Sequence, residues 1–406
     1  MLTRDTGSSK VLAEGGNTAR KRERTIMVSR SVVVAVVLAA VCGGAGGELI
    51  LPKFEQNVEI YRVFGQEHPG PYKHPASITE LDNGDFYIAY YGGANEYSNE
   101  TAVYGSRYVP VPTPSTDAAG QPVRRPGAGV WSYPEVIADT PFEGEGNPVV
   151  WQGPEGTVWL FYNNRKGDTW SNSHVKAKVS KDGAKTWSDS FMVSHEEGLM
   201  VQGPPIVLKD GDYLLPAYSE KGNDRERTSE ATQSFFFRFK PSTGEWSESG
   251  RIKSPQGNLQ PAVVQLADND LFCFLRRGGD FLPTTDGWTL RSESHDGGKT
   301  WSEGVKTEFK NPNAAVGLIK LQNGDLLFVF NDSMNDRSPL TVAVSQDGGE
   351  TWPFRRNIAG GDDDFAYPYA IQARDGKIHI VFTTNGRTTI MQAVFCEEAI
   401  TAFKKE

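Results

Sequence analysis

The chain of 406 residues has few residues of the types that make disulfide scaffolds or metal sites, with three cysteines and six histidines. Cys42 lies in an apolar leader, which leaves Cys273 and Cys396, too few for a disulfide-stabilised fold. No cysteine or histidine spacing is typical of a zinc site, and we expect no metal and no other cofactor.

Basic residues are also in deficit. The chain has 42 Lys and Arg against 51 Asp and Glu, which gives a net charge of -9. This balance argues against a nucleic-acid partner, because binding to phosphates requires a basic face. It does not exclude an acidic small molecule, since a local cluster of arginines can hold one carboxylate.

The sequence shows no long amphipathic helix pattern, and its one extended apolar run is close to the N-terminus. Residues 31–41 are apolar, follow the basic segment KRERTIMVSR and precede small residues. This order predicts a secretory signal peptide or leader over residues 1–47, with Met27 as an alternative start. We therefore expect a secreted or periplasmic protein with no stable membrane partner. An uncleaved N-terminal membrane anchor is the alternative, although the run is short for a span.

What the sequence does contain is a repeated hairpin. Six segments share a small or Pro-containing opening, an apolar strand, a turn and a second apolar strand. They are residues 74–93, 147–164, 203–220, 259–279, 314–333 and 367–387. Pro148 to Pro205 is 57 residues and Pro205 to Pro261 is 56, which suits a four-stranded blade with its loops. The repeat predicts an all-β, six-bladed β-propeller forming a single domain over residues 48–406, and we expect a monomer.

A second repeat stands between these hairpins. The octets are SKDGAKTW (180–187), SHDGGKTW (294–301) and SQDGGETW (345–352). An Asp that binds nearby N–H groups, Gly residues that allow positive φ and a Trp that buries apolar surface predict turns between outer strands, not a catalytic site. Residues 53–64 precede the first hairpin and are expected to add a strand to the last blade. The Pro- and Gly-rich stretch 109–129 is expected to be a long loop in blade one.

Asp-box octets, six blades and a leader together resemble the sialidase (neuraminidase) superfamily, particularly its BNR/Asp-box repeat sialidase-like branch, over about residues 55–396. Sialidases hold the substrate carboxylate with three arginines, attack with a Tyr that a Glu activates, and use an Asp as acid/base. The resemblance therefore implies a secreted glycoside hydrolase of exo-α-sialidase type that acts on the terminal acidic sugar of a glycan.

Three residues match offsets of that family. Arg337 stands eight residues before Ser345 of an octet, and Arg276 stands seven residues beyond the turn of its hairpin. Tyr367 lies nine residues before Gly376, the turn glycine of the last blade. The resemblance implies that Arg276 and Arg337 bind the carboxylate and that Tyr367 faces the anomeric carbon.

Two positions depart from the family pattern. The first family arginine belongs to an R-I-P motif, whereas this chain has Lys73, His74 and a proline. Either side chain can supply positive charge there, without the fork of a guanidinium. The Glu that activates the Tyr is replaced by Gln260, which can orient a phenol but cannot take its proton. Cations near the Tyr, or another carboxylate such as Glu145, would have to compensate.

The remaining candidates follow the first and last hairpins. Glu96, in GGANEYSNE, stands where the family places its acid/base, with Glu100 as second choice. His74 is a further candidate acid/base, since its ordinary pKa near 6.5 suits neutral pH, or a cation that faces the ligand. Arg387 ends the last hairpin and is a candidate ligand of the carboxylate.

Loss of the glutamate leaves two other interpretations open. In a polysaccharide lyase, Tyr367 and His74 would abstract the C5 proton of a clamped uronate. A non-catalytic propeller would keep the cation cluster and bind glycans without turnover, and Gln260 favours this interpretation.

Overall fold

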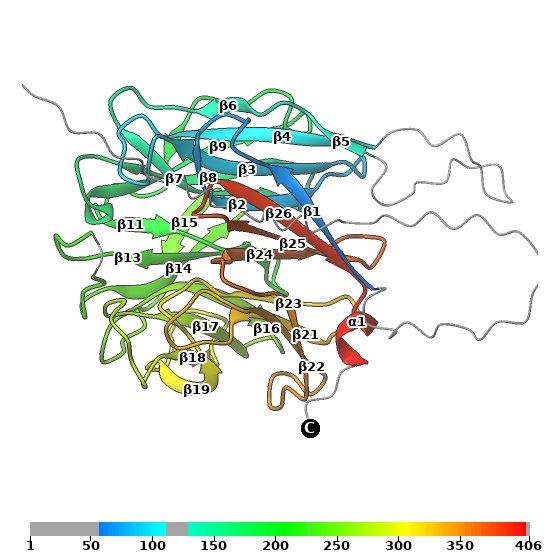
Figure 1. Ribbon diagram of the computed structural model, residues 1–406. Helices are drawn as coiled ribbons and strands as arrows, with labels where there is room; N and C mark the ends of the chain where they lie inside the picture. The colour runs from blue at the N-terminus through cyan, green and yellow to red at the C-terminus, as the bar shows by residue number, and fades with distance from the viewer. Residues whose placement is uncertain (1–56, 111–128, 226, 403–406) are drawn as a thin grey trace, which may run out of the picture. The chain divides into compact units, whose positions relative to one another are not determined.

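The structure is a computed structural model that describes residues 57–110, 129–225 and 227–402. The predicted leader 1–47 and most of the stretch 109–129 lie outside the described residues. In the described ranges six antiparallel sheets of four or five strands form the blades of a β-propeller (Figure 1). The prediction of an all-β, six-bladed propeller is confirmed.

The strands of the first three blades follow one another along the chain. Blade one contains β2 (Tyr72–Glu80), β3 (Phe86–Gly93), β4 (Ala102–Pro110), β5 (Gly129–Trp131) and β6 (Glu135–Ala138). Blade two contains β7 (Gly144–Gln152), β8 (Val158–Arg165), β9 (Ser173–Ser180) and β10 (Phe191–Met192), with a short 3-10 helix at Trp170–Asn172. Blade three contains β11 (Leu199–Val201), β12 (Ile206–Val207), β13 (Tyr213–Ser219), β14 (Gln233–Lys240) and β15 (Glu245–Glu248).

The other three blades have four strands each. Blade four contains β16 (Asn258–Gln265), β17 (Leu271–Arg277), β18 (Trp288–Ser294) and β19 (Val305–Lys310). Blade five contains β20 (Gly317–Lys320), β21 (Leu326–Asn331), β22 (Leu340–Ser345) and β23 (Phe354–Ala359). Blade six contains β24 (Ala366–Gln372), β25 (Ile378–Thr384), β26 (Thr389–Phe395) and β1 (Val58–Phe64), and the helix α1 (Glu398–Thr401) follows it.

The ring closes through the first described strand. β1 pairs antiparallel with β26, with Val58 opposite Phe395, and the two strands lie side by side in Figure 1. The inner strand β2 of blade one contacts both β7 of blade two and β24 of blade six. The strand expected from residues 53–64 is therefore present, and it joins the two ends of the propeller.

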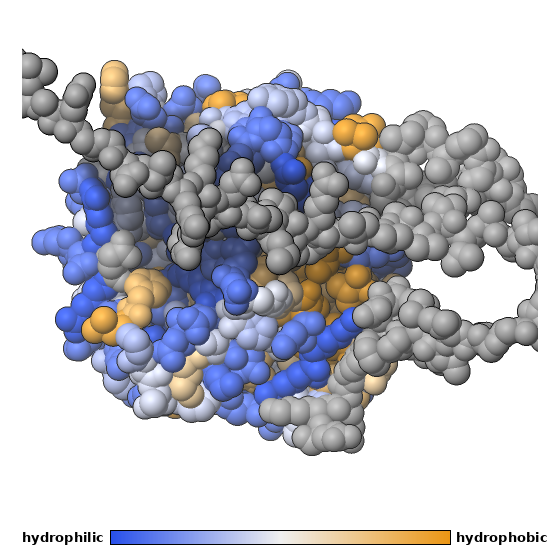
Figure 2. Space-filling view, viewed as in Figure 1, coloured by the Kyte–Doolittle hydropathy of each residue, from blue (hydrophilic) through white to orange (hydrophobic). Residues whose placement is uncertain are grey.

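The second strand of each blade explains the apolar runs in the sequence. All residues of β8, β17 and β25 are buried, because each strand lies between its own sheet neighbours and the adjoining blades. Outer strands such as β23 keep exposed and half-exposed residues. Figure 2 shows one side of the molecule as mainly hydrophilic, consistent with apolar residues that lie mostly within and between blades.

The octets form the turns between the third and fourth strands, as predicted. In the turn between β22 and β23, Asp347 Oδ1 accepts hydrogen bonds from Ser345 Oγ at 2.8 Å and from the backbone N–H of Thr351 at 2.9 Å. Asp182 and Asp296 bind their own turns in the same way. Each Asp thus satisfies backbone donors that a tight turn would otherwise leave without partners.

The same turns connect neighbouring blades. Gly349 has φ of 90°, and a Cβ at this position would lie 2.8 Å from Cζ of Phe272 in blade four. The Trp352 ring packs 5.8 Å from the Phe274 ring of blade four and 5.9 Å from the Phe328 ring of its own blade. The octet turn therefore packs against the neighbouring blade. This role accounts for the recurrence of the octet along the chain.

In residues 57–110, 129–225 and 227–402, no helix is long and apolar enough to span a membrane. No group of three or more His, Cys, Asp or Glu in the same ranges is placed to hold a metal ion.

Candidate active site

A pocket lies at the centre of the ring, and all six blades contribute to its wall. Its empty space, including the part open to solvent, is about 610 Å³. The lining residues are His74, Tyr91, Glu96, Tyr97, Asn147, Trp170, Met200, Tyr218, Glu220, Arg225, Arg227, Thr228, Leu259, Gln260, Arg276, Phe281, Arg337, Tyr367 and Arg387.

Strained positions at the start of the inner strands direct polar side chains into this pocket. Asn147, Gln260 and Tyr367 have φ of 41°, 54° and 54°, in the left-handed region that non-glycine residues rarely adopt. At each position the strand register breaks, and the residue that follows is a proline, which has no N–H to donate to the ladder. Such bulges reorient a side chain at the cost of backbone strain, which is typical of functional sites.

Tyr367 lies at the centre of the polar contacts. Its phenol oxygen accepts hydrogen bonds from Arg276 Nη1 at 2.9 Å and from Gln260 Nε2 at 3.2 Å. Arg276 Nη1 also donates to Gln260 Oε1 at 3.0 Å. Because a guanidinium can only donate, the Gln260 atom beside it is the oxygen, and the amide NH₂ must face the phenol. Two donors therefore converge on the Tyr367 oxygen and stabilise negative charge there.

Two arginines lie over the Tyr367 ring. The Cζ atoms of Arg276 and Arg337 are 5.9 Å and 5.5 Å from the ring centroid. Asn313 holds both side chains: its Oδ1 accepts from Arg276 Nε at 2.7 Å, and its carbonyl accepts from Arg337 Nη2 at 3.3 Å. The buried Nη1 of Arg337 has no hydrogen-bond partner among the described residues. An unpaired, buried guanidinium nitrogen is suited to an anionic ligand.

The electrostatic surroundings of Arg337 also favour an anionic ligand. Burial lowers the pKa of Arg337 to about 10, and the positive charges of Arg387 and Arg276 add to that effect. The guanidinium is still charged at neutral pH, but its neighbours repel it. A bound carboxylate would relieve this repulsion.

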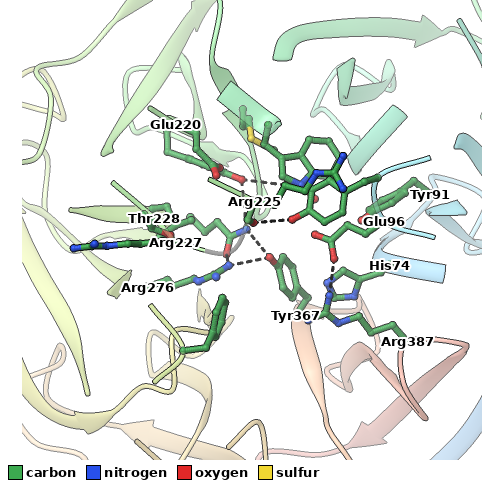
Figure 3. Close-up of a pocket in the computed structure, with 18 of the residues that line it drawn as sticks. His74, Tyr91, Glu96, Glu220, Arg225, Arg227, Thr228, Arg276, Tyr367 and Arg387 are labelled. Carbon is green, nitrogen blue, oxygen red and sulfur yellow. Dashed lines mark hydrogen bonds and ion pairs between the residues drawn. The ribbon is translucent and has the colours of Figure 1, made fainter. Parts of the chain in front are cut away.

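Arg387 supplies a third guanidinium. Its Nη1 donates to Glu96 Oε2 at 2.7 Å and to the Tyr72 hydroxyl at 3.2 Å, and the Tyr72 hydroxyl donates to the same Glu96 oxygen at 2.9 Å. Figure 3 shows Tyr367 with Arg276 on one side and with His74 and Arg387 on the other. Glu96 therefore lines the pocket as expected, but one of its oxygens is occupied by the contacts that orient Arg387.

His74 is an acceptor and not a cation. Its Nδ1 lies 2.8 Å from Thr383 Oγ1, which also lies 3.3 Å from the carbonyl oxygen of Ala366. We assign the proton to Nδ1, because Thr383 can then accept from His74 and donate to Ala366, which leaves Nε2 without a proton. The Nε2 atom is buried and has no partner among the described residues. Burial, together with three nearby arginines, holds the pKa of His74 well below its usual value. The expectation of a positive charge at this position is corrected, because desolvation and like charges oppose protonation.

Lys73 lies outside the pocket lining. Its side chain is fully buried, and its ammonium group donates to the carbonyls of His68 and Gly70. Glu145 is also outside: it accepts hydrogen bonds from Thr140 Oγ1 at 2.6 Å and Asn164 Nδ2 at 3.3 Å. The structure thus brings together every candidate except Lys73, Glu145 and the second-choice Glu100.

Glu220 is a pocket residue that the sequence reasoning missed. It follows β13, and burial raises the pKa of its carboxyl to about 7, which Arg276 opposes and Glu96 reinforces. A signal was available: Tyr218 stands seven residues after the turn glycine Gly211, at the hairpin position that Arg276 occupies in blade four. Glu220 is two residues further on, and alternate residues of a strand face the same side.

Solved structures of other proteins share the fold of this chain. A Hadza microbial sialidase is 18% identical with a TM-score of 0.66, over 84% of this chain and 69% of that one. A protein of unknown function from Dyadobacter fermentans is 15% identical with a TM-score of 0.64, over 83% and 98%. The intramolecular trans-sialidase from Ruminococcus gnavus is 14% identical with a TM-score of 0.63, over 83% and 97%.

The family model for the BNR repeat-like domain matches residues 84–380. The chain therefore belongs to the BNR repeat-like domain family, which confirms the resemblance to the sialidase-like superfamily. No curated protein sequence is significantly similar to it.

Proposed function

We propose that the chain is a secreted glycoside hydrolase of exo-α-sialidase type, which removes a terminal acidic sugar from a glycan. The observation that carries this proposal is the convergence of Arg276, Arg337 and Arg387 on one pocket around the Tyr367 phenol. In this role the three guanidiniums bind the sugar carboxylate, with the unpaired Nη1 of Arg337 as a principal donor. Arg387 takes the place that Lys73 or His74 was expected to fill.

Tyr367 is the proposed nucleophile. In the absence of a glutamate partner, the hydrogen bonds from Arg276 and Gln260 stabilise its oxygen as negative charge develops. The His74 ring packs against the Tyr367 ring, with centroids 4.1 Å apart. Its unprotonated Nε2 is the proposed acceptor of the phenol proton.

One observation favours a second candidate, a polysaccharide lyase. The same neutral His74, beside a phenol oxygen held by two donors, supplies a base and an acid at the edge of an arginine-lined pocket. Such a pair suits removal of the C5 proton from a clamped uronate, followed by loss of the group at C4. The product would contain a C=C bond and absorb in the near ultraviolet.

The test is mass spectrometry of the products after the full chain is incubated with sialylated and uronate-bearing glycans, with Tyr367→Phe beside it. Release of a hydrated acidic monosaccharide by the wild type, abolished in the variant, would support the hydrolase. A product lighter by one water would support the lyase. Retention of a glycan without any product would reject both and leave a binding protein.

A further inference from the structure

The pocket contains two carboxyl groups, those of Glu96 and Glu220, which differ in the hydrogen bonds that they accept. Glu96 Oε2 already accepts hydrogen bonds from Arg387 and Tyr72. No described residue donates a hydrogen bond to the carboxyl of Glu220. Figure 3 shows Glu220 on the far side of Tyr367 from Arg387. One carboxylate therefore orients an arginine, and the other is available to a ligand.

The position of Glu220 is fixed by the backbone around it. Its N–H donates to the carbonyl of Gly198 at 2.7 Å, where blade two passes into blade three. Gly198 has φ of 86°, and a Cβ there would lie 2.7 Å from the carbonyl oxygen of Glu220. Glycine at position 198 allows the two backbones to approach closely. This contact fixes the backbone of Glu220 at the pocket wall.

Glu220 is also close to the hydrogen-bond network of the proposed nucleophile. Tyr218, two residues earlier on the same face of the strand, accepts from Gln260 Nε2 at 3.5 Å and from Asn147 Nδ2 at 3.3 Å. The same Gln260 nitrogen donates to Tyr367 at 3.2 Å. The amide of Gln260 therefore links β13, the strand that precedes Glu220, to the Tyr367 oxygen.

We propose that Glu220, and not Glu96, is the acid/base of this site and donates a proton to the oxygen of the departing glycan. This inference rests on the proposed hydrolase function. Burial raises the pKa of the Glu220 carboxyl, which accepts no hydrogen bond from a described residue, to about 7, so its protonated form is available near neutral pH to act as a general acid. Glu96 is instead held by its ion pair with Arg387.

The reaction balances with groups in the pocket. In the first step the Tyr367 oxygen bonds to the anomeric carbon and the glycosidic C–O bond breaks; the leaving oxygen takes the Glu220 proton, and the phenol proton passes to His74 Nε2. In the second step water attacks the anomeric carbon and gives a proton to the Glu220 carboxylate. Tyr367 leaves and recovers its proton from His74.

The experiment compares two substrates that differ in their need for a proton. Sialyllactose releases an alcohol, whereas the 4-nitrophenyl glycoside of sialic acid releases a stable phenolate. We expect Glu220→Gln in the full chain to lower kcat/KM about 10²- to 10⁴-fold for sialyllactose and less than about tenfold for the nitrophenyl glycoside. An equal loss on both substrates would overturn the proposal.

The pH profile gives a second readout. The charged or titratable side chains around Glu220 are Arg276, Glu96, Tyr218, Arg225 and Arg227. If Glu220 must be protonated, kcat/KM for sialyllactose falls as the pH rises above about 7, the value to which burial raises its pKa. Glu220→Gln should remove this fall, and Glu220→Asp, which retains an acid, should keep it. A fall that persists in Glu220→Gln would contradict the assignment.

Glu145→Gln is the matched control. Burial raises the pKa of Glu145 to about 7 as well, but Glu145 lies outside the pocket lining, so this variant should keep the wild-type substrate ratio and pH profile. If the wild type releases acidic sugar and Glu220→Gln behaves like this control, only the role of Glu220 is overturned. If the wild type releases nothing from either probe, the hydrolase proposal is overturned as well.

Discussion

Arg276 Nη1 lies 2.9 Å from the phenol oxygen of Tyr367, a contact that joins blade four to blade six across the central pocket. Gln260 contacts both partners, with its oxygen toward the arginine and its nitrogen toward the phenol. In sialidases this neighbour of the Tyr is expected to be a glutamate that accepts the phenol proton. Here the same position donates instead, so the proton must leave by another route.

Replacement of Gln260 by Glu tests that difference. The carboxylate would still accept from Arg276, and it would accept the protons of Tyr367 and Tyr218 in place of donating to them. We expect kcat for sialyllactose to rise about tenfold or more, since a positioned base typically contributes at least that much. The control is Gln260→Met, which removes the donor without adding a base and should lower kcat. No gain in Gln260→Glu would indicate that the chain uses another chemistry.

The contacts of Glu96 with Arg387 predict a non-additive pair. Arg387→Ala should reduce kcat/KM by about 10- to 100-fold, the equivalent of one charge-assisted hydrogen bond to the substrate. Glu96→Gln should reduce it less, because its effect passes through the orientation of Arg387. The double variant should be no worse than Arg387→Ala in a double-mutant cycle. Multiplicative losses would instead show that Glu96 acts directly on the substrate, as the sequence first indicated.

Glu145 predicts a dependence of stability on pH. Burial raises the pKa of Glu145 from 4.5 to about 7, so the folded state retains a proton that the unfolded state has lost. Stability from this group is therefore full below about pH 4.5 and is lost as the pH rises to about 7. Glu145→Gln should become more stable relative to wild type across that interval, by up to about 3 kcal/mol. Urea unfolding of both proteins at pH 5 and pH 8 measures the change; a difference that does not vary with pH would contradict the assignment.

The blade-five octet offers two adjacent glycines with different surroundings. Gly348 has φ of 75°, and a Cβ added there would have no neighbouring atom within 4 Å, whereas at Gly349 the Cβ would meet Phe272 at 2.8 Å. Both Ala substitutions incur strain from positive φ, roughly 1 kcal/mol. Gly349→Ala should cost a further amount of about 1–3 kcal/mol, as typical overpacking does. Equal midpoints of thermal unfolding for the two variants would show that this contact between blades contributes little.

Most of the fold was predictable from short sequence patterns, namely apolar runs and turn residues. Second strands such as β8 and β17 are buried on both faces, so they appear in the sequence as continuous apolar runs with turn residues on either side. The octets specify their turns through contacts within eight residues. The strand at residues 58–64 was predicted from its place before the first hairpin, and it pairs with β26 of the last blade.

The candidate site was predictable where a residue keeps a fixed offset within its own hairpin. Arg276, Arg337 and Tyr367 satisfy that condition, and all three line the pocket. Lys73 and His74 have no such fixed offset. A shift of the strand register by one residue decides which of these two neighbours points into the pocket. The structure buries Lys73 against backbone carbonyls and turns His74 toward Tyr367.

The sequence by itself therefore determined the blades, the turns and the residues at repeated positions, because short-range patterns set strand periodicity and turn chemistry. The tertiary structure alone decided the charge states. Glu96 contacts Arg387 across 291 positions of sequence. Burial, reinforced by nearby arginines of blades four, five and six, holds the pKa of His74 well below its usual value. Burial in the central pocket raises the pKa of the Glu220 carboxyl to about 7. Burial and long-range Coulomb interactions depend on the closed ring, and no local pattern encodes them.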